Sequence, residues 1–124
     1  MFGPGGPSFL DLATEALRAT DRGYDHLASK FDTTPFRTPD DLLDQVAVHL
    51  RAGPKIARVL DLCCGTGAVL KRWVDLYDEG TGVDFSRGML DEAARFSPPP
   101  GKRVRWVHAD VLSVACRTRP GCCR

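Results

Sequence analysis

The sequence predicts an α/β fold in which a parallel sheet of about three strands follows a group of helices. In the first 53 residues, apolar side chains recur at helical spacing. After Gly53-Pro54 the pattern changes, and short apolar segments rich in β-branched residues alternate with short helical segments. This alternation is typical of parallel βαβ units with right-handed crossovers.

Three helices are expected in the N-terminal part. The first covers residues 8–23 and ends at Gly23, and the second is a short amphipathic helix over Tyr24–Phe31. The third begins with Thr38 as N-cap and Pro39 in the first turn, buries one apolar face and ends at Gly53. The residues expected on its buried face are Leu42, Leu43, Val46, Ala47 and Leu50.

Three strands and two helices are expected in the part that follows. The strands are Ile56–Leu62, Gly80–Asp84 and Val104–Val107. One helix follows the first strand, and a second is capped by Ser86. The first of these helices is expected to carry Leu70, Trp73, Val74 and Tyr77 on one face.

Composition excludes several classes of protein. A chain of 124 residues with 43% hydrophobic and 27% charged residues is globular and holds at most one domain. The N-terminal residues do not resemble a targeting signal, and no apolar run reaches about 18 residues, so we expect a cytoplasmic protein without membrane contact. The five cysteines lack the even spacing of a disulfide scaffold, and Cys63 and Cys64 are interpreted as reduced packing residues. The three histidines lack metal-ligand spacing, so no metal is expected, and only His108 lies beside the predicted pocket.

A carboxylate lies at the end of each expected strand. Asp61, Asp84 and Asp110 are one βα unit apart and should meet at the carboxyl edge of the sheet, where ligands of such folds bind. The glycine turn at 65–67 lets the backbone approach a ligand closely. The carboxylate of Asp84 can accept hydrogen bonds from both hydroxyls of a ribose. A nicotinamide-dinucleotide site is an alternative, but its third glycine is replaced here by Leu70.

Three motifs resemble those of class I S-adenosylmethionine-dependent methyltransferases. Val59–Gly67 is similar to the family's V-L-D-L-G-C-G-T-G motif, Thr81–Leu90 to its G-x-D-x-S-x-x-M-L motif, and Ala109-Asp110-Val111 to its next element. Tyr24–Phe31 resembles the family's N-terminal Y-D-x-x-A-x-x-Y-D stretch. The closest similarity is to ubiquinone/menaquinone-biosynthesis methyltransferases.

The resemblance implies a Rossmann-like sheet that binds S-adenosylmethionine. Gly65 and Gly67 would lie against the methionine and ribose, Asp61 would orient the methionine, and Asp84 would hold the ribose hydroxyls. Cys63 stands where the family usually has glycine. The implied cofactor-binding residues are Asp61, Cys63, Gly65, Thr66, Gly67, Asp84, Phe85, Met89, Asp110 and Val111.

The resemblance also implies the activity, a methyltransferase with a small-molecule acceptor and no nucleic-acid partner. No catalytic residue can be named, and a catalytically silent cofactor-binding or interaction module is the alternative. The expected units are a helical segment over residues 1–53, a cofactor-binding βαβαβ core over residues 54–112, and an irregular basic, cysteine-rich tail over residues 113–124.

The family's sheet has seven strands, whereas only three are expected here. The sequence after Val111 shows no strand pattern, so we expect a truncated or frame-altered product with reduced or no activity. Ile56–Leu62 would then be an exposed apolar edge, and we expect self-association through it.

Overall fold

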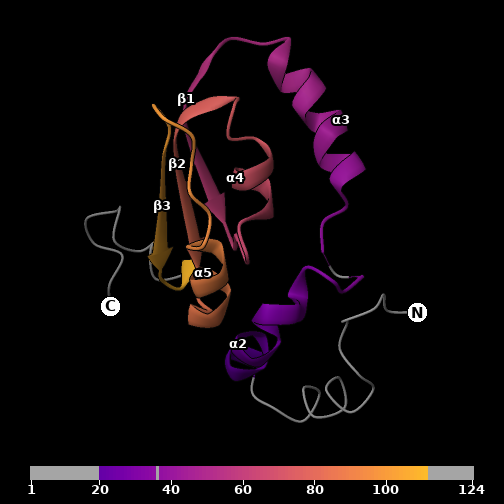
Figure 1. Ribbon diagram of the computed structural model, residues 1–124, viewed down its shortest axis with the longest axis vertical. Coiled ribbons are helices and arrows are strands. Elements are labelled where there is room, and N and C mark those ends of the chain that lie inside the picture. The colour runs from indigo at the N-terminus through magenta and orange to yellow at the C-terminus, as the bar shows by residue number, and fades with distance from the viewer. Residues whose placement is uncertain (1–19, 36, 112–124) are drawn as a thin grey trace, which may run out of the picture.

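The computed structural model describes residues 20–35 and 37–111, in which a parallel sheet of three strands is preceded by two helices (Figure 1). The strand order is β1-β2-β3, so β2 is central and β1 and β3 are the edges. This confirms the predicted α/β class with a Rossmann-like parallel sheet. The elements in chain order are α2 (Thr20–Phe31), α3 (Asp40–Arg51), β1 (Ile56–Leu62), α4 (Ala68–Arg72), β2 (Tyr77–Asp84), α5 (Arg87–Ala93) and β3 (Arg103–His108).

The strands are parallel and in register, so their carboxyl ends lie side by side at the same end of the sheet. Leu62 of β1 pairs with Val83 of β2, and Asp84 pairs with His108 of β3. Two backbone hydrogen bonds continue this pairing beyond the strands, from Cys64 N to Val83 O at 3.0 Å and from Ala109 N to Asp84 O at 2.9 Å. The loops that follow the strands therefore start from fixed positions.

The core lies where α4 and α5 pack against the central strand. Tyr77 and Leu70 are fully buried there, together with Met89. The Tyr77 hydroxyl donates a hydrogen bond of 2.7 Å to Leu70 O, and burial raises the pKa of Tyr77 to about 12. Tyr77 thus stays neutral, and its hydroxyl satisfies a backbone carbonyl group near the C-terminal end of α4.

The helix that follows β1 is shorter than predicted. It ends at Arg72, and Tyr77, which was expected on its face, is instead the first residue of β2. The Trp73 indole N–H donates to Leu43 O of α3 at 2.9 Å, and Leu76 N donates to Trp73 O in a turn. These tertiary contacts fix Trp73 at the helix end, which periodicity alone cannot show.

The N-terminal helices also differ in detail from the prediction. Helix α2 runs through Gly23, so Gly23 is not a helix end, and the part of the first expected helix before Thr20 lies outside the described residues. Pro39, not Thr38, is the N-cap of α3, with no side-chain capping bond. Of the five residues expected to be buried on α3, only Leu43 and Ala47 are.

The two N-terminal helices pack against different helices of the sheet unit. In Figure 1, α2 lies beside α5 and α3 beside α4. An ion pair of 2.6 Å between Arg72 and Asp44 supports the second contact. Among the described residues, no helix has both the length and the apolar character needed to cross a membrane.

Candidate functional site

A cavity of about 400 Å³ lies at the carboxyl ends of β1 and β2, between the sheet and the N-terminal segment. Most of the predicted site residues line it: Asp61, Cys63, Gly65, Thr66, Asp84, Phe85 and Met89. Further lining residues come from α2 and the segment after it, and the sequence did not single them out: Tyr24, Phe31, Asp32, Arg37 and Thr38. For Tyr24 and Phe31 a signal was present in the similarity of Tyr24–Phe31 to a family motif, which does not extend to Asp32, Arg37 and Thr38.

Gly67, Asp110 and Val111 do not line the cavity. Gly67 packs against β3, since a Cβ placed on it would lie 2.4 Å from the Trp106 ring. Glycine is therefore required at position 67 for close packing of the turn on the sheet. A contact between Gly67 and the cofactor stays a prediction. The roles of Asp110 and Val111 as cofactor contacts stay predictions.

The turn after β1 contains three residues in left-handed backbone conformations. Cys63 has φ 60°, Gly65 has φ 54° and Gly67 has φ 82°. A Cβ on Gly65 would meet nothing within 4 Å, so this residue borders open space in the cavity. Cys63 is an L residue in a conformation that favours glycine.

Asp84 joins the two loops that border the cavity. Its carboxylate is buried and accepts a hydrogen bond of 2.8 Å from Gly65 N and one of 2.9 Å from Ser86 N. A carboxylate has about four lone-pair sites, so Asp84 can accept further hydrogen bonds from a ligand. Its two backbone bonds fix the carboxylate at the end of β2.

Asp61 has a buried oxygen without a partner. Its Oδ2 is shielded from solvent and makes no hydrogen bond among the described residues. Burial, and after it the negative charge of Asp84, raises the pKa of Asp61 above its ordinary value. An unpartnered carboxylate oxygen in a ligand-sized cavity suits a cationic or hydrogen-bond-donating ligand group.

The two cysteines of the turn differ from each other. Cys64 is buried, and burial together with the Asp84 and Asp61 charges raises its pKa to about 12, so its thiol stays protonated. Cys63 is exposed and lines the cavity. The interpretation as a packing residue is confirmed for Cys64 and is wrong for Cys63, because Cys63 is exposed.

Aromatic rings form one wall of the cavity. Tyr24 meets Phe85 edge to face, with ring centroids 5.8 Å apart, and lies 6.5 Å from Phe31. These three rings come from α2 and from the loop after β2. Such a wall is suited to pack against a flat heterocycle.

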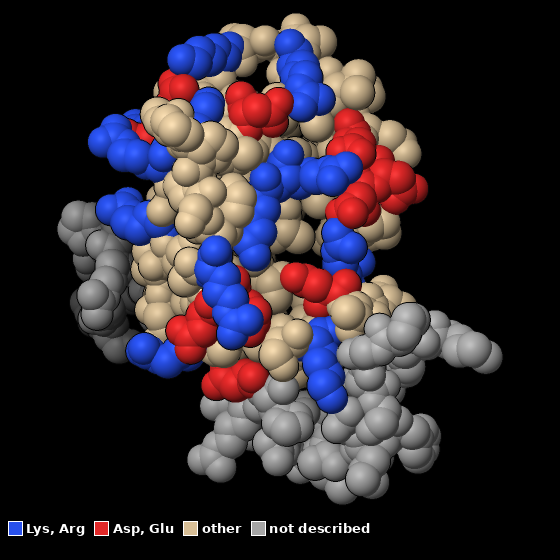
Figure 2. Space-filling view, viewed as in Figure 1, with Lys and Arg blue, Asp and Glu red and all other residues tan. Residues whose placement is uncertain are grey.

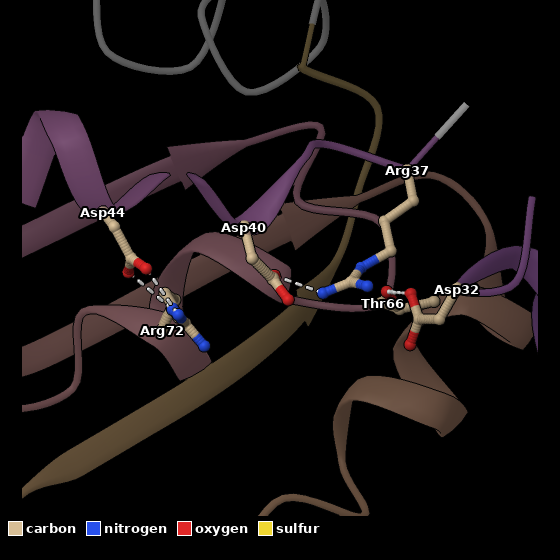
Figure 3. Close-up of polar contacts among 6 residues, drawn as sticks. All are labelled: Asp32, Arg37, Asp40, Asp44, Thr66 and Arg72. Carbon is tan, nitrogen blue, oxygen red and sulfur yellow. Dashed lines mark hydrogen bonds and ion pairs between the residues drawn. The ribbon is translucent and has the colours of Figure 1, made fainter. Parts of the chain in front are cut away.

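Polar contacts connect the N-terminal segment to the turn and to α4 (Figure 3). Thr66 Oγ1 donates to Asp32 Oδ1 at 2.7 Å, and Arg37 pairs with Asp40. A second cavity of about 450 Å³ shares Asp32, Arg37, Thr66 and Ala68 with the first and continues along α4. Arg37 is the one Lys or Arg side chain among the described residues that line the first cavity.

His108, the histidine expected beside the pocket, is exposed and does not line the cavity. Its Nε2 lies 2.8 Å from Phe85 O. Over the face shown in Figure 2, basic and acidic side chains are intermixed. Ion pairs among the described residues include Lys55–Asp78 (3.0 Å) and Arg51–Asp75 (2.7 Å).

Comparisons with known proteins agree with this geometry. Residues 59–120 match a family described as "Methyltransferase domain". A 2-phytyl-1,4-naphtoquinone methyltransferase of Nostoc punctiforme is 37% identical over 75 residues, which cover 56% of this chain and 33% of that relative. A demethylmenaquinone methyltransferase of Chlamydia pneumoniae is 30% identical over 97 residues, which cover 71% of this chain and 39% of that relative.

Two solved structures are similar over most of the chain. The structure titled "DhpI-SAM-HEP complex" has a TM-score of 0.59 and 29% identity, and the alignment covers 86% of this chain and 47% of the other. The structure titled "DhpI-SAH complex structure" has a TM-score of 0.57 and 27% identity, with coverage of 86% and 48%. The chain thus spans less than half the length of the relatives and structures it matches. From its motifs, its sheet and the family match, the chain belongs to the methyltransferase domain family.

Proposed function

We propose that the cavity at the ends of β1 and β2 binds S-adenosylmethionine and that the protein is a methyltransferase of a small-molecule acceptor. The observation that carries the proposal is the unpartnered buried oxygen of Asp61, which borders a cavity next to the open Gly65 turn. Family membership and the two similar structures, whose titles name SAM and SAH, support the same ligand.

The charges around the cavity fit the charges of this cofactor. Its methionine part carries an ammonium, a sulfonium and a carboxylate. Asp61 would accept from the ammonium, directly or through water, and Arg37 would pair with the carboxylate. The pairing requires Arg37 to share its guanidinium between Asp40 and the ligand, which its five donors allow.

The adenosine part would lie beside Asp84, Phe85 and Met89, which line the same cavity. Asp84 is fixed by Gly65 N and Ser86 N and keeps acceptor sites for ribose hydroxyls. The adenine would pack against the wall that contains Tyr24 and Phe85, with Met89 beside it. Asp110 remains a proposed partner of the adenine amine.

The bound cofactor would supply an electrophilic methyl group on sulfur. The residues of this chain would hold it in place, since methyl transfer depends on aligning the acceptor with that methyl group. We assign no catalytic base among the described residues. The names of the relatives favour a quinone-type acceptor.

Three further expectations belong to this proposal. Residues 54–112 would form the binding unit, and residues 1–53 would cover it. The exposed edge of β1 would pair with a second copy of the chain, because its backbone groups lack a neighbouring strand among the described residues. Among the described residues Cys63 and Cys64 form no disulfide, and the expected cytoplasmic location would be tested by cell fractionation.

Titration calorimetry with S-adenosylmethionine and with S-adenosylhomocysteine tests the proposal. We expect binding of both, weakened more by Asp84→Asn than by Asp110→Asn, because the first change alters a carboxylate that is buried within the cavity wall. The expected loss for Asp84→Asn is roughly ten- to hundredfold. Binding without methyl transfer to any quinol would favour the silent module, and no binding would exclude the cofactor site.

A further inference from the structure

We propose that Asp25 of α2 is a positioning residue, which holds the turn between β2 and α5 in the geometry that the cofactor requires. This inference rests on the proposed function, since the turn carries two residues of the proposed cofactor site, Asp84 and Phe85. Asp25 does not itself line the cavity.

A chain of hydrogen bonds leads from α2 to the site. Asp25 Oδ1 accepts from Ser86 Oγ at 2.5 Å and from Gly88 N at 2.8 Å. The backbone N of Ser86 donates to Asp84 Oδ1 at 2.9 Å, and Ser86 Oγ accepts from Met89 N at 3.2 Å. The Asp25 carboxylate, some sixty residues earlier in the chain, thus accepts hydrogen bonds from Ser86 and Gly88, the two neighbours of Arg87.

The electrostatics support an ionised Asp25 in this contact. The hydrogen bond from Ser86, and then that from Gly88, lowers the pKa of Asp25 below its ordinary value. The positive charges of His108 and Arg87 also lower the pKa of Asp25. The carboxylate is therefore charged at neutral pH, and charge-assisted hydrogen bonds are the stronger kind.

The backbones of the two segments also fit closely. A Cβ on Gly88 would lie 2.8 Å from both Cα and O of Asp25, so only glycine allows this approach. The neighbouring residue of α2, Tyr24, then meets Phe85 edge to face at 5.8 Å. The pair Tyr24-Asp25 consequently determines both the position of the Phe85 ring and that of Ser86.

The second end of α2 is held in a comparable way. Asp32, just beyond Phe31, accepts a hydrogen bond of 2.7 Å from Thr66 Oγ1 in the turn after β1 (Figure 3). The segment that covers the cavity is thus fixed to both loops. Asp25 differs from Asp32 in that it acts on the cavity only through Ser86 and Gly88.

Four variants test the proposal by titration calorimetry with S-adenosylhomocysteine. Asp25→Ala removes the acceptor, and we expect the Kd to rise about tenfold, the effect of one to two hydrogen bonds. Asp25→Asn keeps an Oδ1 acceptor at the same place and should stay within about threefold of the parent. Gly88→Ala keeps Asp25 but separates the backbones, so it should weaken binding as Asp25→Ala does.

Asp91→Ala is the matched control, because Asp91 is an exposed residue of α5. Alanine raises helix propensity at both 88 and 91, so loss of affinity at 88 alone would come from the contact with Asp25. Amide hydrogen exchange adds a second readout, with protection of the Gly88 N–H reduced in Asp25→Ala and kept in Asp25→Asn.

The outcomes separate this inference from the function it rests on. If the parent, Asp25→Ala and Gly88→Ala bound the ligand with equal affinity, the positioning role of Asp25 would be overturned and the cofactor site would stand. A loss in Asp25→Asn as large as in Asp25→Ala would do the same, since the acceptor would then not be the cause. Failure of the parent itself to bind would overturn the cofactor site and with it this role.

Discussion

At the scale of single residues, Asp61 shows how a proposed ligand-binding group can reduce the stability of the protein that carries it. Its Oδ2 is buried without a partner, and Asp84 adds like-charge repulsion. A ligand cation would remove this cost, whereas the free protein retains it.

We therefore predict that Asp61→Asn stabilises the free protein and weakens binding of S-adenosylmethionine. Loss of the half-buried charge should raise Tm by roughly 3–6 °C, corresponding to about 1 kcal/mol. Thermal unfolding followed by circular dichroism measures the first effect and calorimetry the second. Asp75→Asn is the control, because its pKa is lowered by Arg51 and its loss should not raise Tm.

The pH dependence of this variant follows from the direction of the pKa shift. Because the pKa of Asp61 is higher in the folded protein, the folded state binds more protons between the two pKa values, and stability falls as pH rises through this window. The Tm difference between Asp61→Asn and the parent should be fully present at neutral pH. It should shrink as pH falls toward the ordinary aspartate pKa of about 3.9, and a constant difference would contradict the assignment.

Cys63 supports a second prediction at this scale. It is an exposed residue with φ 60°, so Cys63→Gly should stabilise the protein by about 0.5–1 kcal/mol, the relief of the left-handed strain less the added chain entropy of glycine. Urea unfolding measures the change. Cys63→Ala keeps the Cβ and should match the parent; a gain equal to that of glycine would show that the thiol, not the backbone, is the cause.

At the scale of elements, Gly65 and Gly67 of the turn after β1 have different structural roles. Gly67 packs against Trp106 of β3, whereas Gly65 borders open space. Gly67→Ala should therefore destabilise the protein by about 1–3 kcal/mol more than Gly65→Ala, because both changes strain a positive φ but only the first also clashes.

Denaturant unfolding of the two glycine variants measures this difference, and fluorescence in a Trp73→Phe background, in which Trp106 is the remaining tryptophan, serves as a local probe. A shifted emission in Gly67→Ala and an unchanged one in Gly65→Ala would agree with the packing. Equal losses of stability in both variants would mean that the Trp106 contact contributes little.

The elements also show what sequence reasoning could and could not predict. The bounds of β1 were predicted as observed, because a short apolar segment, interrupted only by Arg58 and Asp61 and bounded by Gly53-Pro54 and a glycine turn, has few other interpretations. The Ser86 cap was likewise correct, since capping is a local interaction. By contrast, Tyr77 was assigned to a helix, because its periodicity was helical while its burial under α4 depends on tertiary packing.

The candidate site was predictable to the same extent. The positions at strand ends, Asp61, Asp84 and Gly65, are specified by local motifs and line the cavity. The residues that close it, such as Asp32 and Arg37, belong to a segment that sequence spacing cannot place against the sheet. The unequal exposure of Cys63 and Cys64 also depends on backbone angles that the sequence does not reveal.

At the scale of the whole molecule, β1 is an edge of the sheet that the described residues form, and its side chains Leu60 and Leu62 are 62% and 51% exposed. We expect the protein to self-associate through this edge, and Leu60→Lys to reduce the association, because a charged residue on an edge strand disfavours pairing. Light scattering over a range of concentrations measures it. A parent that is monodisperse and monomeric, with strong amide protection at Val59–Leu62, would contradict this expectation.

The central claim is that the ends of β1 and β2 form a cofactor site, and backbone amide chemical-shift mapping with S-adenosylhomocysteine tests it most directly. The account predicts that the largest changes fall on Gly65, Thr66 and the turn that begins at Asp84, with smaller changes on the exposed residues of α3. Saturable changes centred on any other part of the chain, or none at millimolar ligand, would contradict it.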